Sequence, residues 1–239
     1  MCAVWGLHFV VVKLAVGLAP PMFYAAARMT LVALIMAPFL RWHPGQMRAV
    51  LLGGVCLGAL NYAFLFNGVR HATASASAIA IELYVPFATL LSVVFLGEKV
   101  GWRRVVGIAL AFAGVAIIAL GRGEARVGAG VGLVALAGLT EAIGAILVKR
   151  ARLKPQQLLA WFAVIGAVFL WMATLVFEKG HLNALAEANV LFLGAAVIYS
   201  AVCASVFGHT AYYWLLQRLP VSLVASSALL TTLLGVSRI

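Results

Sequence analysis

The chain has 239 residues, of which 65% are hydrophobic and only 10% are charged, and its formal net charge at pH 7 is +11. Soluble domains carry about 25% charged residues, so this composition excludes a water-soluble globular protein and predicts a polytopic membrane protein whose main partner is the lipid bilayer. Nucleic acid is excluded as a partner, because the Lys and Arg residues lie in short connections between apolar runs, where they act as orientation signals, and form no patch interleaved with aromatic residues.

The apolar runs predict membrane-spanning helices. Such a helix needs about 20 mostly apolar residues, and charged residues, Pro and Gly divide the chain into nine candidate segments. The ninth is too short, because its 14 residues rise only about 21 Å against a hydrocarbon core of about 30 Å. No basic region precedes the first segment, so we expect it to remain as a helix and not to be cleaved as a signal peptide. The segments are Cys2–Leu18, Met22–Leu40, Ala49–Val69, Ala76–Leu96, Val105–Leu120, Val131–Val148, Leu158–Phe177, Val190–Leu216 and Leu223–Val236.

The basic residues in the connections predict the orientation. With a cytoplasmic N-terminus, ten Lys and Arg residues face the cytoplasm and four face outward. Cytoplasmic connections carry the excess of Lys and Arg in membrane proteins, so this asymmetry predicts that the N-terminus is cytoplasmic. The ten are Arg41, Arg48, Lys99, Arg103, Arg104, Lys149, Arg150, Arg152, Lys154 and Arg218, and the four are Arg70, Arg122, Arg126 and Lys179.

The order of the segments repeats along the chain. In each half a short helix ends in Lys (Lys13, Lys149), a Pro follows a few residues later (Pro20, Pro155), and a long pair then precedes a helix that starts with small residues. An odd number of crossings per unit places the second unit upside down relative to the first. We therefore predict an all-α fold of two inverted five-helix repeats, residues 1–121 and residues 129–239, the second one C-terminally incomplete. Transporters built in this way bind substrate near the midplane, between the repeats.

Several motifs resemble those of one transporter family. They are Trp5-Gly6-x-x-Phe9-x-x-x-Lys13, Arg28, Pro86-Phe87, Leu96-Gly97-Glu98 and Gly107-Ile108-Ala109-Leu110-Ala111-Phe112-Ala113-Gly114-Val115. Together they look like an EamA-type member of the drug/metabolite transporter superfamily, strongly in the first half and more weakly in the second. The resemblance implies ten helices in two inverted EamA repeats. It also implies movement of small metabolites, amino acids among them, often outward and often coupled to protons, and we expect a location in a bacterial inner membrane.

The chain departs from this family pattern near its end. The second repeat should finish its fourth helix with a Pro and a Gly-Glu pair and then add a fifth helix. Thr231-Thr232-Leu233-Leu234 stands where the Pro is expected, and the remaining elements do not follow. One alternative to a working transporter is therefore a truncated membrane protein that does not transport.

Ionisable residues inside the predicted spans are the first candidates for a site. Insertion of each into the membrane costs roughly 2.5–3.5 kcal/mol, so each needs a reason to be there. These residues are Lys13, Arg28, Glu82 and Glu141. Arg28 and Glu82 are each the seventh residue of spans that run in the same direction, and Lys13 lies at a similar depth. These three residues predict a cluster of two cations and one carboxylate. His8, near the middle of the first span, is the preferred cavity residue among the uncharged polar ones.

Pro86 predicts a helix kink beside Glu82. Because Pro has no N–H, the carbonyl of Glu82 loses its normal helical partner. A bent helix with a free carbonyl next to a carboxylate resembles the broken helices at transporter sites. Glu82 is therefore a candidate for taking up and releasing a proton.

Each candidate residue also has a purely structural interpretation. Arg28 and Glu82 form either a static ion pair or part of a substrate and proton site. Lys13 either joins that site or extends to the outer membrane surface, and Glu141 either lines the cavity or pairs with a neighbouring helix. Polar residues that either line the cavity or hydrogen-bond across helices are His8, Asn61, Asn67 and His209. Aromatic residues that either wall the cavity or form interfacial belts are Trp5, Tyr62, Tyr84, Trp161, Tyr212, Tyr213 and Trp214.

The motifs expected of an enzyme are missing. The sequence contains no P-loop, no Asp, and no His, Cys and Glu cluster at metal-ligand spacing, so we expect no metal, no cofactor and no ATP-driven pumping. A membrane-embedded enzyme, the least favoured alternative, would need a polar catalytic cluster at one interface. We predict a secondary transporter that exports small polar metabolites such as amino acids by alternating access, with or without proton coupling.

Overall fold

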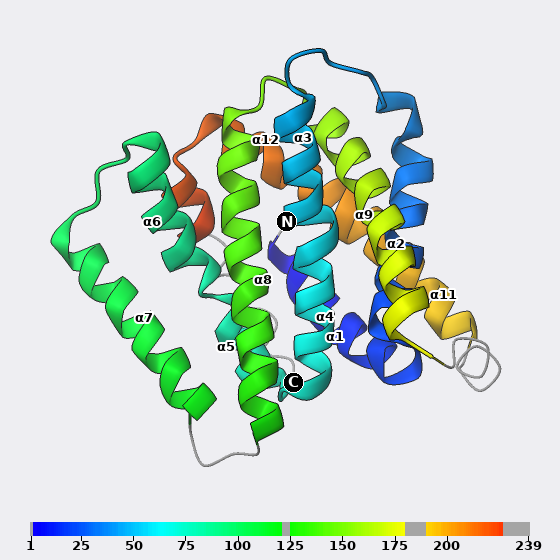
Figure 1. The fold of residues 1–239 in the computed structure, drawn as a ribbon, viewed down its shortest axis with the longest axis horizontal. Coiled ribbons are helices and arrows are strands. Elements are labelled where there is room, and N and C mark those ends of the chain that lie inside the picture. The colour runs from blue at the N-terminus through cyan, green and yellow to red at the C-terminus, as the bar shows by residue number, and fades with distance from the viewer. Residues whose placement is uncertain (1, 121–124, 180–189, 227–239) are drawn as a thin grey trace.

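The computed structural model describes residues 2–120, 125–179 and 190–226. Every regular element in these ranges is a helix, and Figure 1 shows the helices running up and down through one bundle. In chain order they are α1 (Cys2–Leu18), α2 (Pro21–Met36), the 3₁₀ helix η1 (Ala37–Phe39), α3 (Met47–Gly53), the π-helix η2 (Gly54–Leu60), α4 (Asn61–His71), α5 (Ala74–Ile81), α6 (Tyr84–Leu96), α7 (Trp102–Leu120), α8 (Ala125–Arg150), α9 (Pro155–Phe177), α11 (Val190–Tyr199), the π-helix η3 (Ser200–His209) and α12 (Thr210–Arg218).

Seven stretches of helix in the described ranges are long and apolar enough to cross a membrane. They coincide with the second to eighth spans predicted from the sequence. The first predicted span is a shorter apolar helix, Ala3–Leu18. Of the ninth, residues up to 226 are helical, and the remainder lies outside the described residues. The seven are Pro21–Phe39, Met47–His71, Ala76–Leu96, Trp102–Leu120, Gly128–Arg150, Pro155–Phe177 and Val190–Arg218.

Two of these spans contain a π-helical segment. The π-helix η2 separates α3 from α4, and the π-helix η3 separates α11 from α12. π-helical turns inside α-helices are rare and are found mostly at functional sites. One lies in the third helical span of the first half of the chain (residues 2–120), and the other lies in the third helical span of the second half (residues 125–226).

The two halves pack closely against each other. Helix α2 packs along α9, α4 packs along α8, and α1 contacts η3. Between η2 and α9, Gly58 faces Gly166, and a Cβ at Gly58 would overlap the backbone carbonyl of Phe162. Small residues at such a crossing let two helix backbones approach. The contact between the halves therefore involves backbone as well as side chains.

Helix α7 lies at the edge of this bundle. Among its described residues only Val115 is buried, and Figure 1 shows the helix standing apart from most of the bundle. Most of its apolar side chains are therefore left uncovered by the rest of the described residues. The other helices form the interior of the described protein.

A buried carboxylate ties the end of α9 to the start of α2. The backbone N–H groups of Met22 and Phe23, in the first turn of α2, each donate a 2.9 Å hydrogen bond to the carboxylate oxygens of Glu178. The Thr174 hydroxyl donates to the same carboxylate at 2.6 Å, and Glu178 is 8% exposed. The first N–H groups of a helix have no partner within it, and they attract negative charge, so Glu178 stabilises the start of α2.

A second carboxylate makes the same kind of contact at the other end of the bundle. Glu98, just after α6, accepts hydrogen bonds from the backbone N–H groups of Val221 at 2.9 Å and Ser222 at 3.4 Å. Partial burial raises the pKa of Glu98, but these bonds, with those from the Ser222 and Ser92 hydroxyls, outweigh it and hold the pKa below its ordinary value. The Gly-Glu motif of the sequence thus joins the first half to the helical residues that follow α12.

Candidate functional site

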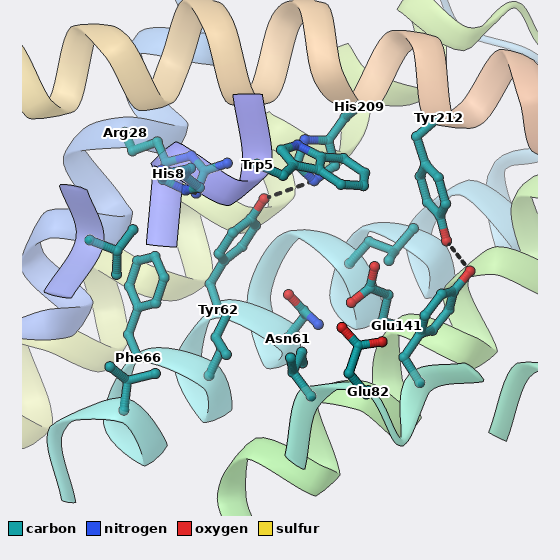
Figure 2. A pocket seen from close by; sticks show the side chains of 16 residues that line it. Trp5, His8, Arg28, Asn61, Tyr62, Phe66, Glu82, Glu141, His209 and Tyr212 are labelled. Atoms are coloured by element: carbon teal, nitrogen blue, oxygen red, sulfur yellow. Dashed lines mark hydrogen bonds between the residues drawn. The ribbon is translucent and has the colours of Figure 1, made fainter. Parts of the chain in front are cut away.

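A cavity lies between the two halves of the chain. Its volume is about 130 Å³, roughly ten times what one water molecule needs, so a small molecule fits inside. Helices α1, α2, η2, α4, α5 and α6 of the first half and α8, η3 and α12 of the second half contribute to its wall. Figure 2 shows the lining residues: Trp5, His8, Val12, Arg28, Leu57, Asn61, Tyr62, Leu65, Phe66, Val69, Ile81, Glu82, Tyr84, Glu141, His209 and Tyr212.

Arg28 of α2 lies at one end of this cavity and is bound by neutral groups. Its Nε donates to the Ser205 hydroxyl at 3.0 Å, and its NH1 nitrogen donates to Nε2 of His8 at 2.8 Å. The guanidinium carbon lies 4.7 Å from the centre of the Tyr62 ring, a cation–π contact. Only 1% of Arg28 is exposed. We call Arg28, His8, Ser205 and Tyr62 the arginine end of the pocket.

The partners of His8 fix its tautomer. Because Arg28 can only donate, Nε2 of His8 must be the acceptor and therefore carries no proton. The proton is then on Nδ1, which donates to the Ser200 hydroxyl at 3.3 Å. Ser200 in turn lies 2.5 Å from the Tyr24 hydroxyl, which donates to the carbonyl of Ala196. This chain of hydrogen bonds connects α1 and α2 with η3 and α11, so it joins the two halves.

Glu82 and Glu141 lie at the opposite end of the cavity, as Figure 2 shows. Glu82 follows the last residue of α5 in the first half, and Glu141 lies in the middle of α8 in the second half. Both side chains are half-buried and are close enough to interact electrostatically. We call Glu82, Glu141 and the neighbouring Asn61 the acid end of the pocket.

The helix is interrupted shortly before Pro86, where the sequence predicts a kink, and the predicted free carbonyl of Glu82 is wrong. Helix α5 ends at Ile81 and α6 begins at Tyr84, so Glu82 lies within the break. The carbonyl of Glu82 accepts a 3.0 Å hydrogen bond from the N–H of Val85. The chain tightens locally from an i+4 to an i+3 hydrogen bond, which supplies the partner that Pro86 cannot provide.

Other polar contacts around the cavity also join the two halves. The Asn61 amide donates to the carbonyl of Ala137 at 2.9 Å and lies within hydrogen-bonding reach of Glu141. The hydroxyls of Tyr84 and Tyr212 are 2.5 Å apart, and the Trp5 indole N–H donates to the carbonyl of Ala204 at 3.0 Å. The wall of the cavity is therefore aromatic, with polar groups aimed inward at a few points.

His209 has the same tautomer as His8. Its Nδ1 lies 2.8 Å from the carbonyl of Ala204 and must donate to it. Its Nε2 then accepts from the Tyr62 hydroxyl, 3.3 Å away. Tyr62 thus contacts Arg28 with its ring and His209 with its hydroxyl, and it connects the arginine end to the π-helix η3.

The structure brings together four of the five predicted site residues. His8, Arg28, Glu82 and Glu141 line the cavity, whereas the predicted cluster of Lys13, Arg28 and Glu82 does not form. Lys13 is not among the lining residues, and its Nζ donates to the carbonyl of Val69 at 3.2 Å. The position of Lys13 on its helix turns the side chain away from the interior, and the side chain is exposed.

The arrangement also differs from a static Arg28–Glu82 ion pair. The hydrogen-bond partners of Arg28 among the described residues are His8 and Ser205, and Figure 2 shows Glu82 at the far end of the pocket. Equal sequence position within two spans predicts equal depth, but it does not predict which faces of the two helices meet. Arg28 and Glu82 therefore belong to different ends of one cavity.

Sequence reasoning missed several residues that hold the site together. Ser200 and Ser205 carry the hydrogen bonds from His8 and Arg28, and Tyr24 extends that network. The sequence contains one hint of them: polar residues recur at positions 200, 205 and 209 of an otherwise apolar span. Their spacing of four and five residues follows the wider turn of the π-helix η3.

Some aromatic residues lie outside the cavity. The Trp161 indole donates to the carbonyl of Arg41 at an exposed position, and Trp214 is 46% exposed and stacks with Arg218. These two residues fit the interfacial belt. Within the described residues, no group of three or more His, Cys, Asp or Glu side chains is placed to hold a metal ion.

Three curated relatives match most of the chain. The "Probable amino-acid metabolite efflux pump" of Escherichia coli (strain K12) is 27% identical over 245 residues, which cover 98% of this chain and 81% of the relative. The protein of the same description from Salmonella typhimurium is also 27% identical, with 98% and 81% covered. The "Probable terminal-alkyne amino-acid exporter" of Streptantibioticus cattleyicolor is 27% identical over 168 residues, which cover 69% of this chain and 55% of the relative.

A solved structure shares the fold. Its title is "Crystal structure of protein"; it superimposes with a TM-score of 0.65 at 18% sequence identity and covers 99% of this chain and 88% of the solved one. The model of the family described as "EamA-like transporter family" matches residues 1–120. Since that match spans half of the 239 residues, and the motifs of the first half resemble the same family, the chain is an integral membrane protein that belongs to the EamA-like transporter family.

Proposed function

We propose that this chain exports small metabolites of the amino-acid class across the bacterial inner membrane by alternating access, with protons moving in exchange. Relatives described as an amino-acid metabolite efflux pump and an amino-acid exporter support the substrate class and the direction. The membrane-length helices support the location. The basic connections predicted to be cytoplasmic, at the ends of α6, α8 and α12, lie at one end of the bundle in Figure 1, which supports a cytoplasmic N-terminus.

The observation that carries this proposal is the position of the cavity between the two halves. Its polar contacts cross from one half to the other: Arg28 to Ser205, Asn61 to Ala137, and Tyr84 to Tyr212. A site of this kind changes its exposure when one half rocks against the other, and substrate sites of inverted-repeat transporters lie at such an interface.

The internal similarity of the two halves supports the inverted-repeat part of the proposal. A π-helix occupies the third span of each half. The second spans of the two halves, α2 and α9, pack along each other. The third span of each half contacts the first span of the other, α4 with α8 and η3 with α1. Equivalent helices thus occupy equivalent places, as two related units are expected to do.

The acid end supports proton exchange. Glu82 lies in a helix break and Glu141 lies on a different half of the chain, and both face the cavity from inside the membrane-spanning region. Groups from the surrounding helices that face this end are Asn61, Tyr84 and Tyr212, while Arg28, His8 and His209 lie toward the other end. Membrane-embedded carboxylates in such positions serve as proton carriers in pumps and transporters.

The test is uptake of labelled neutral amino acids into inside-out proteoliposomes whose lumen is more acidic than the medium. Uptake should depend on the gradient and should stop when a protonophore is added. Glu82→Gln should reduce it to the level of protein-free liposomes. Glu98→Gln is the matched control, because its amide oxygen can still accept the hydrogen bond from Val221. Wild-type uptake by Glu82→Gln would exclude the proposed proton site, and gradient-independent uptake would exclude proton exchange.

A further inference from the structure

Three helices end together at the end of the bundle that we expect to be cytoplasmic. Figure 1 shows the C-termini of α6, from the first half, and of α8 and α12, from the second half, at this end. Arg150 of α8 donates a hydrogen bond to the carbonyl of Phe95 in the last turn of α6. Lys149 donates to the carbonyl of Leu219, just after α12, at 2.7 Å. The bonds from the helix that follows α12 to Glu98 complete a ring of contacts among the three helix ends.

This ring carries an excess of positive charge. Four cations each make one of its contacts or adjoin a residue that does, and we call them the basic cluster. They are Lys99, Lys149, Arg150 and Arg218. Glu98 is the only acidic residue in the stretches 97–101, 149–154 and 217–222, and it accepts hydrogen bonds from backbone N–H groups.

The groups that the basic cluster contacts do not balance its charge. Besides backbone carbonyls they are aromatic rings: the guanidinium carbon of Arg150 lies 5.9 Å from the centre of the Phe95 ring, and that of Arg218 lies 4.0 Å from the Trp214 ring. The C-terminus of each helix contributes roughly −0.5 charge. The three helix ends and Glu98 together leave the four cations with a net charge of about +1.5, so the cluster still attracts an anion.

Uncovered apolar side chains adjoin the basic cluster. Val94 and Phe95 in the last turn of α6 are exposed, and so is Trp214, one turn before Arg218 in α12. These residues belong to helical spans of membrane length, so their side chains lie level with the acyl chains, while cations at the ends of the spans lie level with the lipid headgroups. A neighbour that satisfies both surfaces needs a negative charge joined to an apolar tail.

We propose that the basic cluster binds the phosphate of an anionic phospholipid, whose acyl chains lie along α6 and α12. Basic sites between membrane-spanning helices on the cytoplasmic side bind lipid headgroups of this kind. A soluble phosphate would use the cations but would leave the apolar side chains uncovered. The lipid contacts α6 of the first half together with α8 and α12 of the second half, so it holds the two halves together at this end of the bundle. This site does not depend on the transport activity proposed above.

Three probes separate the charge of this ligand from its acyl chains. Phosphatidylglycerol carries a net negative charge and acyl chains, phosphatidylcholine with the same chains carries no net charge, and glycerol 3-phosphate carries the charge without the chains. Each is added to the purified full chain in an uncharged detergent, and binding is measured by the rise in thermal stability with concentration. Phosphatidylglycerol should stabilise the protein at a far lower concentration than phosphatidylcholine, and glycerol 3-phosphate should not stabilise it.

Substitutions in the cluster locate the site. Arg218→Gln should weaken phosphatidylglycerol binding by roughly fivefold, and Lys149→Gln combined with Arg150→Gln by roughly 30-fold, because each cation near the headgroups contributes separately. The described contacts of Arg218 lie within its own helix, so Arg218→Gln leaves the ring of contacts among the helix ends intact. The matched control is Arg41→Gln combined with Arg48→Gln. It removes two charges from the same expected side of the membrane, outside the cluster, and should leave the affinity unchanged.

Four results would overturn the proposal. Equal stabilisation by phosphatidylglycerol and phosphatidylcholine would show that apolar contact alone holds the lipid, and no stabilisation by phosphatidylglycerol would show that none binds. An equal loss of affinity in the cluster and control variants would replace the site with a general attraction of basic residues to anionic membranes. Stabilisation by glycerol 3-phosphate at the same concentration as phosphatidylglycerol would assign the cluster to a soluble phosphate.

Discussion

The two charged ends of the central pocket are built in different ways. At the arginine end, a full positive charge is 1% exposed, and His8 from the first half and Ser205 from the second half each accept one hydrogen bond from it. At the acid end, two carboxylates remain half-buried on the wall of the cavity. Both ends place ionisable residues inside the membrane-spanning region, where each costs several kcal/mol to insert.

The difference shows that an ionisable residue in a membrane span can serve the fold or the ligand. Arg28 joins α1, α2 and η3 through His8 and Ser205, so its charge is committed to packing. Glu82 and Glu141, which come from different halves of the chain, line the wall of the cavity at its other end. Access to the cavity, and not the mere presence of a charge, separates the two roles. Substitutions at the two ends should therefore change different properties: transport at the acid end and stability at the arginine end.

The largest effect is expected from Glu141→Gln at the acid end. This change removes one of the two carboxylates that we propose to exchange the proton, so gradient-driven uptake should fall to the background of protein-free liposomes. The unfolding temperature should not fall, because the repulsion between the two carboxylates disappears as well. Uptake and thermal unfolding are measured on the same preparation. If the Glu141→Gln variant kept its uptake but unfolded at a lower temperature, Glu141 would serve the fold and not transport.

Arg28→Gln at the arginine end should act mainly on stability. The variant loses two hydrogen bonds made by a charged group, and the unfolding free energy in mixed micelles should fall by about 2–4 kcal/mol. The cost of burying the charge disappears too, which limits the loss. A variant as stable as the wild type that nevertheless fails to bind phenylalanine would contradict the structural role of Arg28.

Ser205→Ala should weaken the same end by a smaller amount. It leaves the Nε donor of Arg28 buried without its present acceptor, which costs about 1–3 kcal/mol. Ser226→Ala serves as the control, because the Ser226 hydroxyl bonds within its own helix, to the carbonyl of Ser222, and its loss should cost only about 0.5 kcal/mol. Equal effects of the two substitutions would show that Ser205 does not hold Arg28.

The smallest effect is expected from Glu98→Gln. Glu98 lies outside the cavity, and its carboxylate accepts hydrogen bonds from backbone N–H groups. Its pKa is lowered in the folded state by the hydrogen bonds from Val221 and Ser222, despite partial burial. The ionised form therefore stabilises the fold above the ordinary pKa, and this contribution is lost as the pH falls through the lowered value. The stability difference between the wild type and Glu98→Gln should be constant near neutral pH and should shrink below about pH 4.5. A difference that does not change with pH would contradict this contact.

The helical spans could be predicted from the sequence because length and hydropathy alone determine them. The second to eighth spans agree with the structure to within a few residues. The helix break beside Pro86 was also predictable, since the missing N–H has a local consequence. The new partner of the Glu82 carbonyl was not, because an i+3 hydrogen bond depends on how the chain tightens around the break.

The site could be predicted only in part. Charge inside a span identifies Arg28, Glu82 and Glu141 as candidates, but in helices that are apolar all round it does not indicate which faces meet. This is why the expected cluster with Lys13 does not form, and why Arg28 pairs with His8 and Ser205. The hydrogen bonds that Glu98 and Glu178 accept could not be predicted. Their donors are backbone N–H groups more than 100 residues away in the chain, and a backbone N–H group leaves no mark in the sequence.

The most direct test of the two-ended pocket is the release of protons when phenylalanine binds to the purified protein in weakly buffered detergent solution. If the acid end exchanges a proton for the substrate, about one proton should be released per bound molecule, and the release should disappear in the Glu82→Gln, Glu141→Gln double variant. Arg28→Lys should still release the proton. Saturable binding of phenylalanine to the wild type without proton release would contradict the account.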